Sequence, residues 1–247
     1  IAVSVKRGAN FDVDRQLANI DEAVREGYRA LILVPINDPR IVARVNGLEG
    51  QGIPVVFLTN YLEATNCLCY VGCDYFKSGR IAAELFHLLI GPEAVIGMIS
   101  NPLTMLGTNR RLFGLRAAME SEYPGMRLVE VMEVLSDEGA AYSATLDLLR
   151  RHPEIDCLFY TTGGLVGGLT AVRELGLFGR LKIVSVDLAR HITEAMREGG
   201  IQATISQEPE EQGYAAIKVC FDFLVAHVEP REKNHLIEPS IKLKESL

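Results

Sequence analysis

Residues 181–214 read LKIVSVDLARHITEAMREGGIQATISQEPEEQGY, and this is the most informative stretch of the chain. Its first segment, from Leu181 to Asp187, is short, apolar and β-branched, and it ends on a carboxylate. This pattern is typical of a strand buried in a parallel sheet. The run from Ala189 to Glu198 carries apolar residues at helical spacing and stops at Gly199-Gly200, so we expect a helix there.

The second half of the stretch predicts another strand and another helix. The segment 202–205 is short and apolar and leads to Ser206-Gln207, after which Pro209 and an acidic cluster favour a helix start. Asp187 and Gln207 therefore follow the carboxyl ends of successive strands. Open α/β sheets bind their ligands at such strand ends, so both residues are candidate ligand contacts.

The same alternation of strand and helix extends over the rest of the chain. It implies crossover connections and a parallel sheet, hence an α/β fold. The strands predicted from apolar, β-branched runs are residues 1–5, 29–34, 53–58, 67–72, 94–99, 127–134 and 155–160, with a last one within 236–244. The helices expected between them are 14–26, 39–50, 76–89, 108–122, 140–151 and 165–175, with a long one over 209–228.

Composition excludes several classes of protein. The chain has 247 residues, of which 48% are hydrophobic and 23% charged, enough for one large or two small globular domains. No apolar stretch approaches the ~20 uncharged residues that cross a bilayer. The net charge is −7 and no basic run is present, so this piece alone is a poor candidate for contact with DNA.

The five cysteines do not predict a disulfide framework, because their number is odd. Cys67, Cys69 and Cys73 would face one side of an extended strand, which admits a metal site, but the spacing matches no usual zinc pattern. Buried thiols in a reducing cytosol are the favoured interpretation. No metal ligand, catalytic residue or cofactor is predicted.

Two other patterns in the sequence could indicate a chemical role, but each has a simpler explanation. The glycine run 163–168 lacks the lysine and hydroxyl residue of a phosphate loop, so close backbone approach at a strand-to-helix turn is the better explanation. The histidines are scattered and no nucleophile elbow is present, which leaves hydrolytic chemistry with little support.

Several segments of the chain resemble a known family. The segments that carry this resemblance are LANIDEAVREG (17–27), VGCDYFKSGRIAA (71–83), NPL (101–103) with NRRLFGL (109–115), RHPEID (151–156) and the opening stretch 181–214. Together they resemble type I periplasmic binding proteins of the ribose-binding-protein type and the ligand-binding cores of lactose-repressor-type (LacI-type) transcription regulators. The ending, IKLKESL (241–247), resembles the regulators more than the transport proteins.

The resemblance implies a two-lobed α/β fold, each lobe a parallel sheet flanked by helices, with several hinge crossings. One lobe would comprise residues 1–73 and 208–236, and the other 74–207 and 237–247. The family has a further strand-helix unit ahead of the position of Ile1, in the middle of the first sheet. We therefore expect upstream residues in the native protein.

The resemblance also implies a set of ligand contacts. Arg111 would be brought to a sugar by the loop and helix after residue 101, although a solvated helix-face arginine is the alternative. Asp187 could instead cap the following helix, and Gln207 could be only a hinge residue. The full set of predicted ligand-binding residues is Arg111, Asp187, Gln207, Thr162, Asn60, Thr59 and Ser136.

Two departures from the family bear on the identity of the ligand. The family's sugar-binding Asn-Asp pair after Phe159 is replaced by Thr161-Thr162-Gly163-Gly164, and its acid-arginine pair after the third strand is replaced by Thr59-Asn60. These positions therefore do not predict that the chain binds the same ligand as the family.

The first functional hypothesis is the effector-binding core of a LacI-type regulator that closes on a sugar or polyol. It would be a cytoplasmic homodimer that contacts DNA only through an absent N-terminal helix-turn-helix, with no membrane contact. The chief alternative is a periplasmic sugar-binding protein of an ABC transporter. An α/β enzyme, such as a small-molecule isomerase, is the third hypothesis.

Overall fold

The computed structural model describes residues 2–6 and 12–247, and it contains two compact units. Unit 1 comprises Ile1–Cys73 and Glu208–Ile237, and unit 2 comprises Asp74–Gln207 and Glu238–Leu247. These units differ from the predicted lobes by one residue, Ile237. The assignment of these ranges to two lobes stays a prediction.

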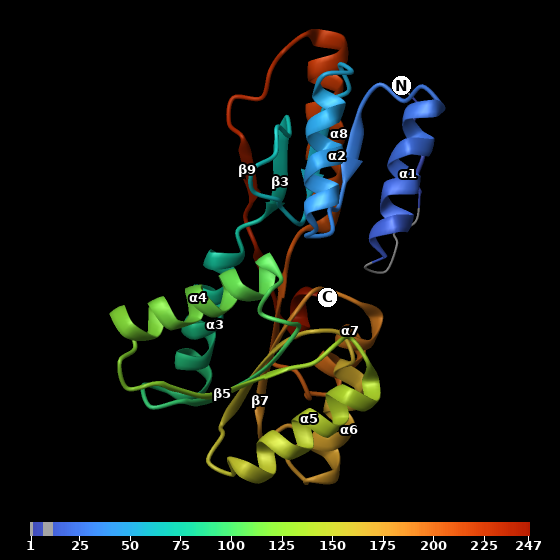
Figure 1. The fold of residues 1–247 in the computed structure, drawn as a ribbon. Coiled ribbons are helices and arrows are strands. Elements are labelled where there is room, and N and C mark those ends of the chain that lie inside the picture. Colours follow the sequence, from blue (N-terminus) through green and yellow to red (C-terminus); the bar gives the residue numbers. More distant parts are fainter. Residues whose placement is uncertain (1, 7–11) are drawn as a thin grey trace. The chain divides into compact units, whose positions relative to one another are not determined.

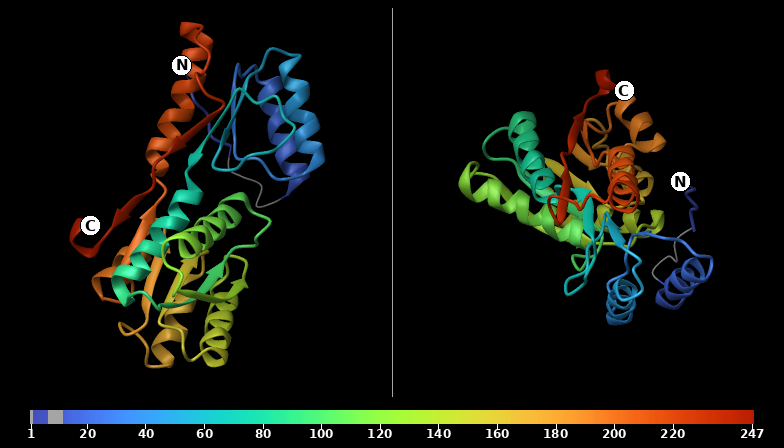
Figure 2. Two further views of the ribbon diagram at one scale, coloured as in Figure 1. Left: turned by 90° about the vertical axis from the view of Figure 1, so that its left-hand side faces the viewer. Right: turned by 90° about the horizontal axis from the view of Figure 1, so that it is seen from above.

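Unit 1 is a four-stranded parallel sheet with helices on both faces. The strand order is β1-β2-β3-β9, and α8 lies on one face of the sheet while α1 and α2 lie on the other (Figure 2). Its elements are α1 (Val13–Arg25), β1 (Leu31–Leu33), α2 (Pro39–Glu49), β2 (Val55–Leu58), β3 (Cys69–Cys73), α8 (Pro209–Phe221), the π-helical turn η1 (Asp222–Ala226) and β9 (Asn234–Ile237).

Unit 2 is a six-stranded sheet in the order β10-β8-β7-β6-β4-β5, parallel except for β10. Its elements are α3 (Tyr75–Ile90), β4 (Val95–Ser100), α4 (Leu106–Ser121), β5 (Arg127–Glu133), α5 (Glu138–Arg151), β6 (Cys157–Thr161), α6 (Leu165–Glu174), β7 (Lys182–Val186), α7 (Arg190–Arg197), β8 (Ala203–Ser206), β10 (Ser240–Lys242) and the 3-10 turn η2 (Lys244–Ser246). The α/β class with parallel sheets flanked by helices is confirmed.

The core of unit 2 has one layer on each face of the sheet. Helices α3 and α4 cover one face and α5, α6 and α7 cover the other (Figure 1). Phe86 and Phe159 are fully buried and meet edge to face in the first layer, with ring centroids 6.2 Å apart. Alternate residues of β6 enter opposite layers, as the pleat of a strand buried on both faces requires.

The predicted strand at residues 1–5 is wrong for residues 2–5. The structure describes no strand between residues 2 and 6, and Ile1 lies outside the described residues. The side chains of Val3 and Val5 are 61% and 84% exposed. Among the described residues β1 pairs only with β2, so residues 2–5 do not add a strand at the open edge of β1. A β-branched sequence does not form a strand unless a partner strand pairs with it.

The predicted C-terminal strand is two strands, one in each sheet. β9 ends at Ile237 and pairs with β3 in unit 1, whereas β10 begins at Ser240 and pairs with β8 in unit 2. Pro239 lies between them, and proline cannot donate to a ladder, so it breaks the continuous strand. The long helix is also shorter than expected, because α8 ends at Phe221 and continues as η1.

All five cysteines are free thiols and buried. Burial raises the pKa of the Cys157 thiol far above its usual range and that of Cys220 to about 11. These two thiols are therefore protonated near neutral pH and behave as small apolar side chains. Among residues 2–6 and 12–247, no helix is long and apolar enough to cross a membrane.

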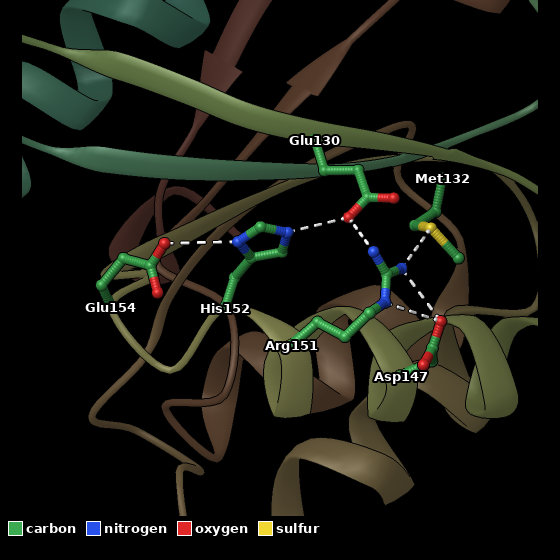
Figure 3. Close-up of polar contacts among 6 residues, drawn as sticks. All are labelled: Glu130, Met132, Asp147, Arg151, His152 and Glu154. Atoms are coloured by element: carbon green, nitrogen blue, oxygen red, sulfur yellow. Dashed lines mark hydrogen bonds and ion pairs between the residues drawn. The ribbon is translucent and has the colours of Figure 1, made fainter.

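A network of charged side chains holds the edge strand β5 to the end of α5 (Figure 3). The Glu130 carboxylate contacts the guanidinium of Arg151 and lies 3.0 Å from His152 Nε2. Arg151 also donates to Asp147 Oδ2 at 2.9 Å, and His152 Nδ1 lies 3.2 Å from Glu154 Oε1. β5 pairs with β4 alone, so these contacts are a second attachment for the edge of the sheet.

Changing Glu130 to Gln is expected to destabilise the protein at neutral pH by about 0.5–1 kcal/mol, the range of partly exposed ion pairs. The hydrogen bond from Arg151, with a further one from His152, holds the pKa of the Glu130 carboxyl below its usual value. Its stabilisation is therefore complete above the unfolded-state pKa and is lost as the pH falls through the lower, folded-state value.

Thermal melts of wild type and Glu130→Gln, taken from neutral pH down to about pH 3, measure this difference. The two melting temperatures should converge at acidic pH. Glu194→Gln is the control, because its partner Arg190 is 90% exposed and the pair is expected to contribute little. A gap between wild type and Glu130→Gln that persists at the lowest pH would contradict the assignment.

Candidate functional site

The carboxyl ends of the parallel strands β4 to β8 lie along one edge of the unit 2 sheet. Four predicted site residues lie in the chain just after these ends or within the following loops: Ser136, Thr162, Asp187 and Gln207. Arg111 lies on α4, which follows β4. The structure brings these residues together in two groups and leaves Arg111 in a third position.

Asp187 and Gln207 form one group. Gln207 Nε2 donates a hydrogen bond to Asp187 Oδ1, joining the ends of the neighbouring strands β7 and β8. The Asp187 backbone is also held, because its N–H donates to the Ile205 carbonyl at 3.1 Å and its carbonyl accepts from Thr204 Oγ1 at 2.5 Å. Asp187 has a φ of 72°, in the left-handed region that aspartate tolerates better than most residues.

The alternative role of Asp187 as a helix cap does not hold in the structure. The N-cap of α7 is Ala189, and no side chain makes a capping bond there. Asp187 is exposed, and its carboxylate accepts from Gln207 through one oxygen. An ionised carboxylate accepts about four hydrogen bonds, so the group retains capacity for ligand hydroxyls.

Asn101, Ser136 and Thr162 form the second group, here called the Asn101 cluster. Asn101 Oδ1 accepts from Thr162 Oγ1 at 2.8 Å and from Ser136 Oγ at 3.1 Å. Asn101 was not predicted as a site residue. The available signal was its position directly after the last residue of β4, Ser100, and before Pro102.

Arg111 is buried, with only 5% of its surface exposed, whereas its neighbours Arg110 and Arg116 are exposed. Its guanidinium carbon lies 4.6 Å from the ring centroid of Tyr75, the first residue of α3. A cation this close to an aromatic face is stabilised by the ring quadrupole. The alternative of a solvated helix-face arginine is therefore wrong, while its contact with a ligand stays a prediction.

Close contact between α3 and α4 places Arg111 beside Tyr75. A Cβ on Gly79 would lie 2.0 Å from the Arg111 carbonyl oxygen, and one on Gly114 would lie 1.9 Å from the Phe76 carbonyl oxygen. Real Cβ atoms never approach that closely. The absence of a side chain at each glycine therefore allows the backbones of α3 and α4 to pack in direct contact.

Thr59 and Asn60 lie in unit 1, where they follow β2. Asn60 Nδ2 donates to the Pro35 carbonyl at 2.7 Å, and the Thr59 carbonyl accepts from Tyr70 Oη at 3.3 Å. Thr59 has a φ of 59°. Both residues therefore support the turn after β2, and their role as ligand contacts stays a prediction.

Unit 1 also contains a buried glutamine, Gln16, which is not among the predicted site residues. Gln16, 8% exposed, donates from Nε2 to the Val34 carbonyl and accepts from the Ile36 N–H, both at 2.9 Å. It satisfies backbone groups directly after β1 as a neighbouring strand would. Nothing in its local sequence context distinguishes it from a surface helix residue.

The chemistry at the unit 2 strand ends is hydrogen bonding by hydroxyls, amides, one carboxylate and one guanidinium. Across residues 2–6 and 12–247, no group of three or more His, Cys, Asp or Glu side chains could hold a metal ion. A surface depression of about 630 Å³ lies instead at the start of β5, bordered by Arg116, Met126 and His152. It contains none of the candidate residues.

Comparisons with known proteins agree on the fold. A family model described as "Periplasmic binding protein domain" matches residues 1–226. A D-ribose/D-allose-binding protein of Pseudomonas aeruginosa is 24% identical over 241 residues, which cover 94% of this chain and 74% of that protein. A ribose import binding protein of Bacillus subtilis is 22% identical and covers 87% and 70%.

Solved structures extend this similarity. A periplasmic ribose ABC transporter structure from Conexibacter woesei has a TM-score of 0.86 at 25% identity, covering 96% of this chain and 80% of that one. A periplasmic solute-binding protein from Actinobacillus succinogenes with bound D-allose has a TM-score of 0.87 at 21% identity, covering 97% and 85%. The predicted two-lobed periplasmic-binding-protein fold is confirmed.

The prediction of a LacI-type regulator is wrong. The relatives are named as sugar-binding and sugar import proteins, several of them periplasmic, so the regulator function and the cytoplasmic location are both overturned. The proposed contact with DNA and the homodimer rested on the regulator interpretation and lose their support with it. Regulators and transport proteins share this fold, and a fold by itself does not determine function.

Proposed function

Because the chain belongs to the periplasmic binding protein domain family, we propose that it binds a small sugar or polyol for a membrane importer. The observation that carries the proposal is the Asp187–Gln207 pair, fixed at the ends of the adjacent strands β7 and β8. The names of the relatives, which include ribose-, allose- and xylitol-binding proteins, support the class of ligand.

The polar groups suit a neutral ligand that carries several hydroxyls. Asp187 only accepts hydrogen bonds, Arg111 only donates them, and Gln207 does both. A sugar hydroxyl can donate to a carboxylate and accept from an amide or guanidinium at once. The opposite charges of Asp187 and Arg111 favour a ligand without net charge over an anion or a cation.

Binding without turnover distinguishes this function from the enzyme hypothesis. The proposed role of the site residues is to hold the ligand, and none of them is assigned a nucleophile or base. Thr162 and Ser136 act in this proposal through their shared hydrogen-bond partner, Asn101. Release of the sugar to a membrane transporter completes the proposed role.

Isothermal titration calorimetry with D-ribose, D-allose, D-arabinose and xylitol tests the proposal. At least one of them is expected to bind in a one-to-one ratio with a dissociation constant in the micromolar range, about −8 kcal/mol. The sugar should be recovered unchanged after incubation. L-leucine, which has no vicinal hydroxyls, is the control and should release no binding heat.

Two results would overturn the proposal. The first is the absence of binding by all four carbohydrates under conditions where the protein is folded. The second is chemical conversion of a bound sugar, which would favour the enzyme hypothesis.

A further inference from the structure

We propose that Asn101 is a further ligand-binding residue of unit 2, which donates hydrogen bonds from its amide nitrogen to a sugar oxygen. The inference rests on the proposed sugar-binding function. Asn101 follows β4, whose neighbours in the sheet are β5 and β6. Its side-chain oxygen joins the loops after these two strands, through Ser136 and Thr162.

The two hydroxyl contacts orient the amide. Both reach Oδ1, at 2.8 Å from Thr162 and 3.1 Å from Ser136, which leaves the NH2 group directed away from them. Within the described part of the chain, no hydrogen bond from Asn101 Nδ2 is found, and the residue is only partly buried. Its two N–H donors are therefore available to a ligand.

The surroundings hold the amide in place. Thr162 is 9% exposed, and a Cβ on Gly163 would lie 2.7 Å from Ser136 Cβ and 3.0 Å from its Oγ. The loops after β5 and β6 are thus in direct contact beside Asn101. A donor fixed before the ligand arrives loses little conformational entropy on binding, which raises affinity and selectivity.

The spacing of the strands is compatible with a single sugar bound by Asn101 and Asp187. β4 and β7 are separated only by β6, so their backbones lie about 10 Å apart. Two short side chains and one sugar ring can fill that distance. Asp187 accepts hydrogen bonds at one end and Asn101 donates at the other, which would favour a sugar with a hydroxyl or ring oxygen in the matching position.

Two substitutions separate ligand contact from loop positioning. Asn101→Ala removes the whole amide, whereas Asn101→Asp keeps an oxygen acceptor for Ser136 and Thr162 but removes both N–H donors. Calorimetry with whichever of D-ribose, D-allose, D-arabinose and xylitol binds wild type most tightly is expected to show about ten-fold weaker binding for both variants. Their melting temperatures should stay close to that of wild type.

The side-chain amide resonance of Asn101 in wild type gives a test without substitution. It is assigned by its absence from the nitrogen-15 spectrum of Asn101→Asp, and it should shift when the same sugar is added to saturation. Wild-type affinity of Asn101→Ala, or restoration of that affinity by Asn101→Asp, overturns the inference, as does an unshifted resonance. Failure of all four carbohydrates to bind wild type instead overturns the proposed function, and the inference falls with it.

Discussion

Replacing Gly114 by alanine is expected to destabilise the protein by about 3 kcal/mol, because the new methyl group meets the backbone of α3. A Cβ there would lie 1.9 Å from the Phe76 carbonyl oxygen and 3.2 Å from the Arg80 nitrogen. Neither atom belongs to a flexible side chain, so the helices must separate. Separation would weaken the core layer in which Leu112 and Leu115 are buried.

Thermal unfolding followed by circular dichroism measures this effect, which corresponds to a melting temperature about 6–12 °C lower. Gly213→Ala is the matched control, since Gly213 also lies inside a helix but a Cβ there would meet nothing within 4 Å. That variant is expected to be neutral or slightly stabilising, because alanine favours the helix. Equal melting temperatures for the two variants would contradict the tight crossing of α3 and α4.

Removing the Asp187 carboxylate is expected to weaken sugar binding by roughly ten- to a hundred-fold. Charge-assisted hydrogen bonds contribute about 1.5–3 kcal/mol each, and this residue is the only carboxylate among the proposed contacts. Asp187→Ala keeps a Cβ at a φ of 72°, in the left-handed region where alanine is more strained than aspartate. Asp187→Gly removes the same carboxylate without that strain.

Calorimetry on both variants, with the carbohydrate that binds wild type most tightly, separates the two effects. Asp187→Ala and Asp187→Gly should lose similar affinity, while the alanine variant should melt at a lower temperature than the glycine variant. Glu194→Ala is the control for the change in net charge, because Glu194 lies exposed on α7 and pairs with Arg190. Wild-type affinity in Asp187→Gly would exclude Asp187 from the site.

The corrections to the predicted fold concern pairing and chain breaks. The alternating apolar and helical patterns predicted most strands and helices, because burial on both faces of a parallel sheet requires them. The segment 2–5 has the same local pattern but no partner strand, and the predicted C-terminal strand is divided at Pro239. A pattern within a segment specifies what the segment can form, while pairing depends on what lies beside it.

The candidate site shows the same division between local and long-range information. The positions of Asp187 and Gln207 after neighbouring strands are predictable from sequence because the end of a parallel strand is a local signal. The Asn101 cluster has no such local signal, because Ser136 and Thr162 are 35 and 61 residues away from Asn101 along the chain. The burial of Arg111 was likewise not predictable from its own helix, since Gly79 and Tyr75 belong to a different one.

The α/β class, the order of most elements and the strand ends at which polar residues gather were all predictable from the local sequence. These features follow from periodicity and from backbone preferences that act over a few residues. The tertiary structure alone decided the left-handed backbone of Asp187, the orientation of the Asn101 amide and the contact of Arg111 with Tyr75. Each of these depends on atoms from distant segments that only packing of the core brings within hydrogen-bonding or van der Waals distance.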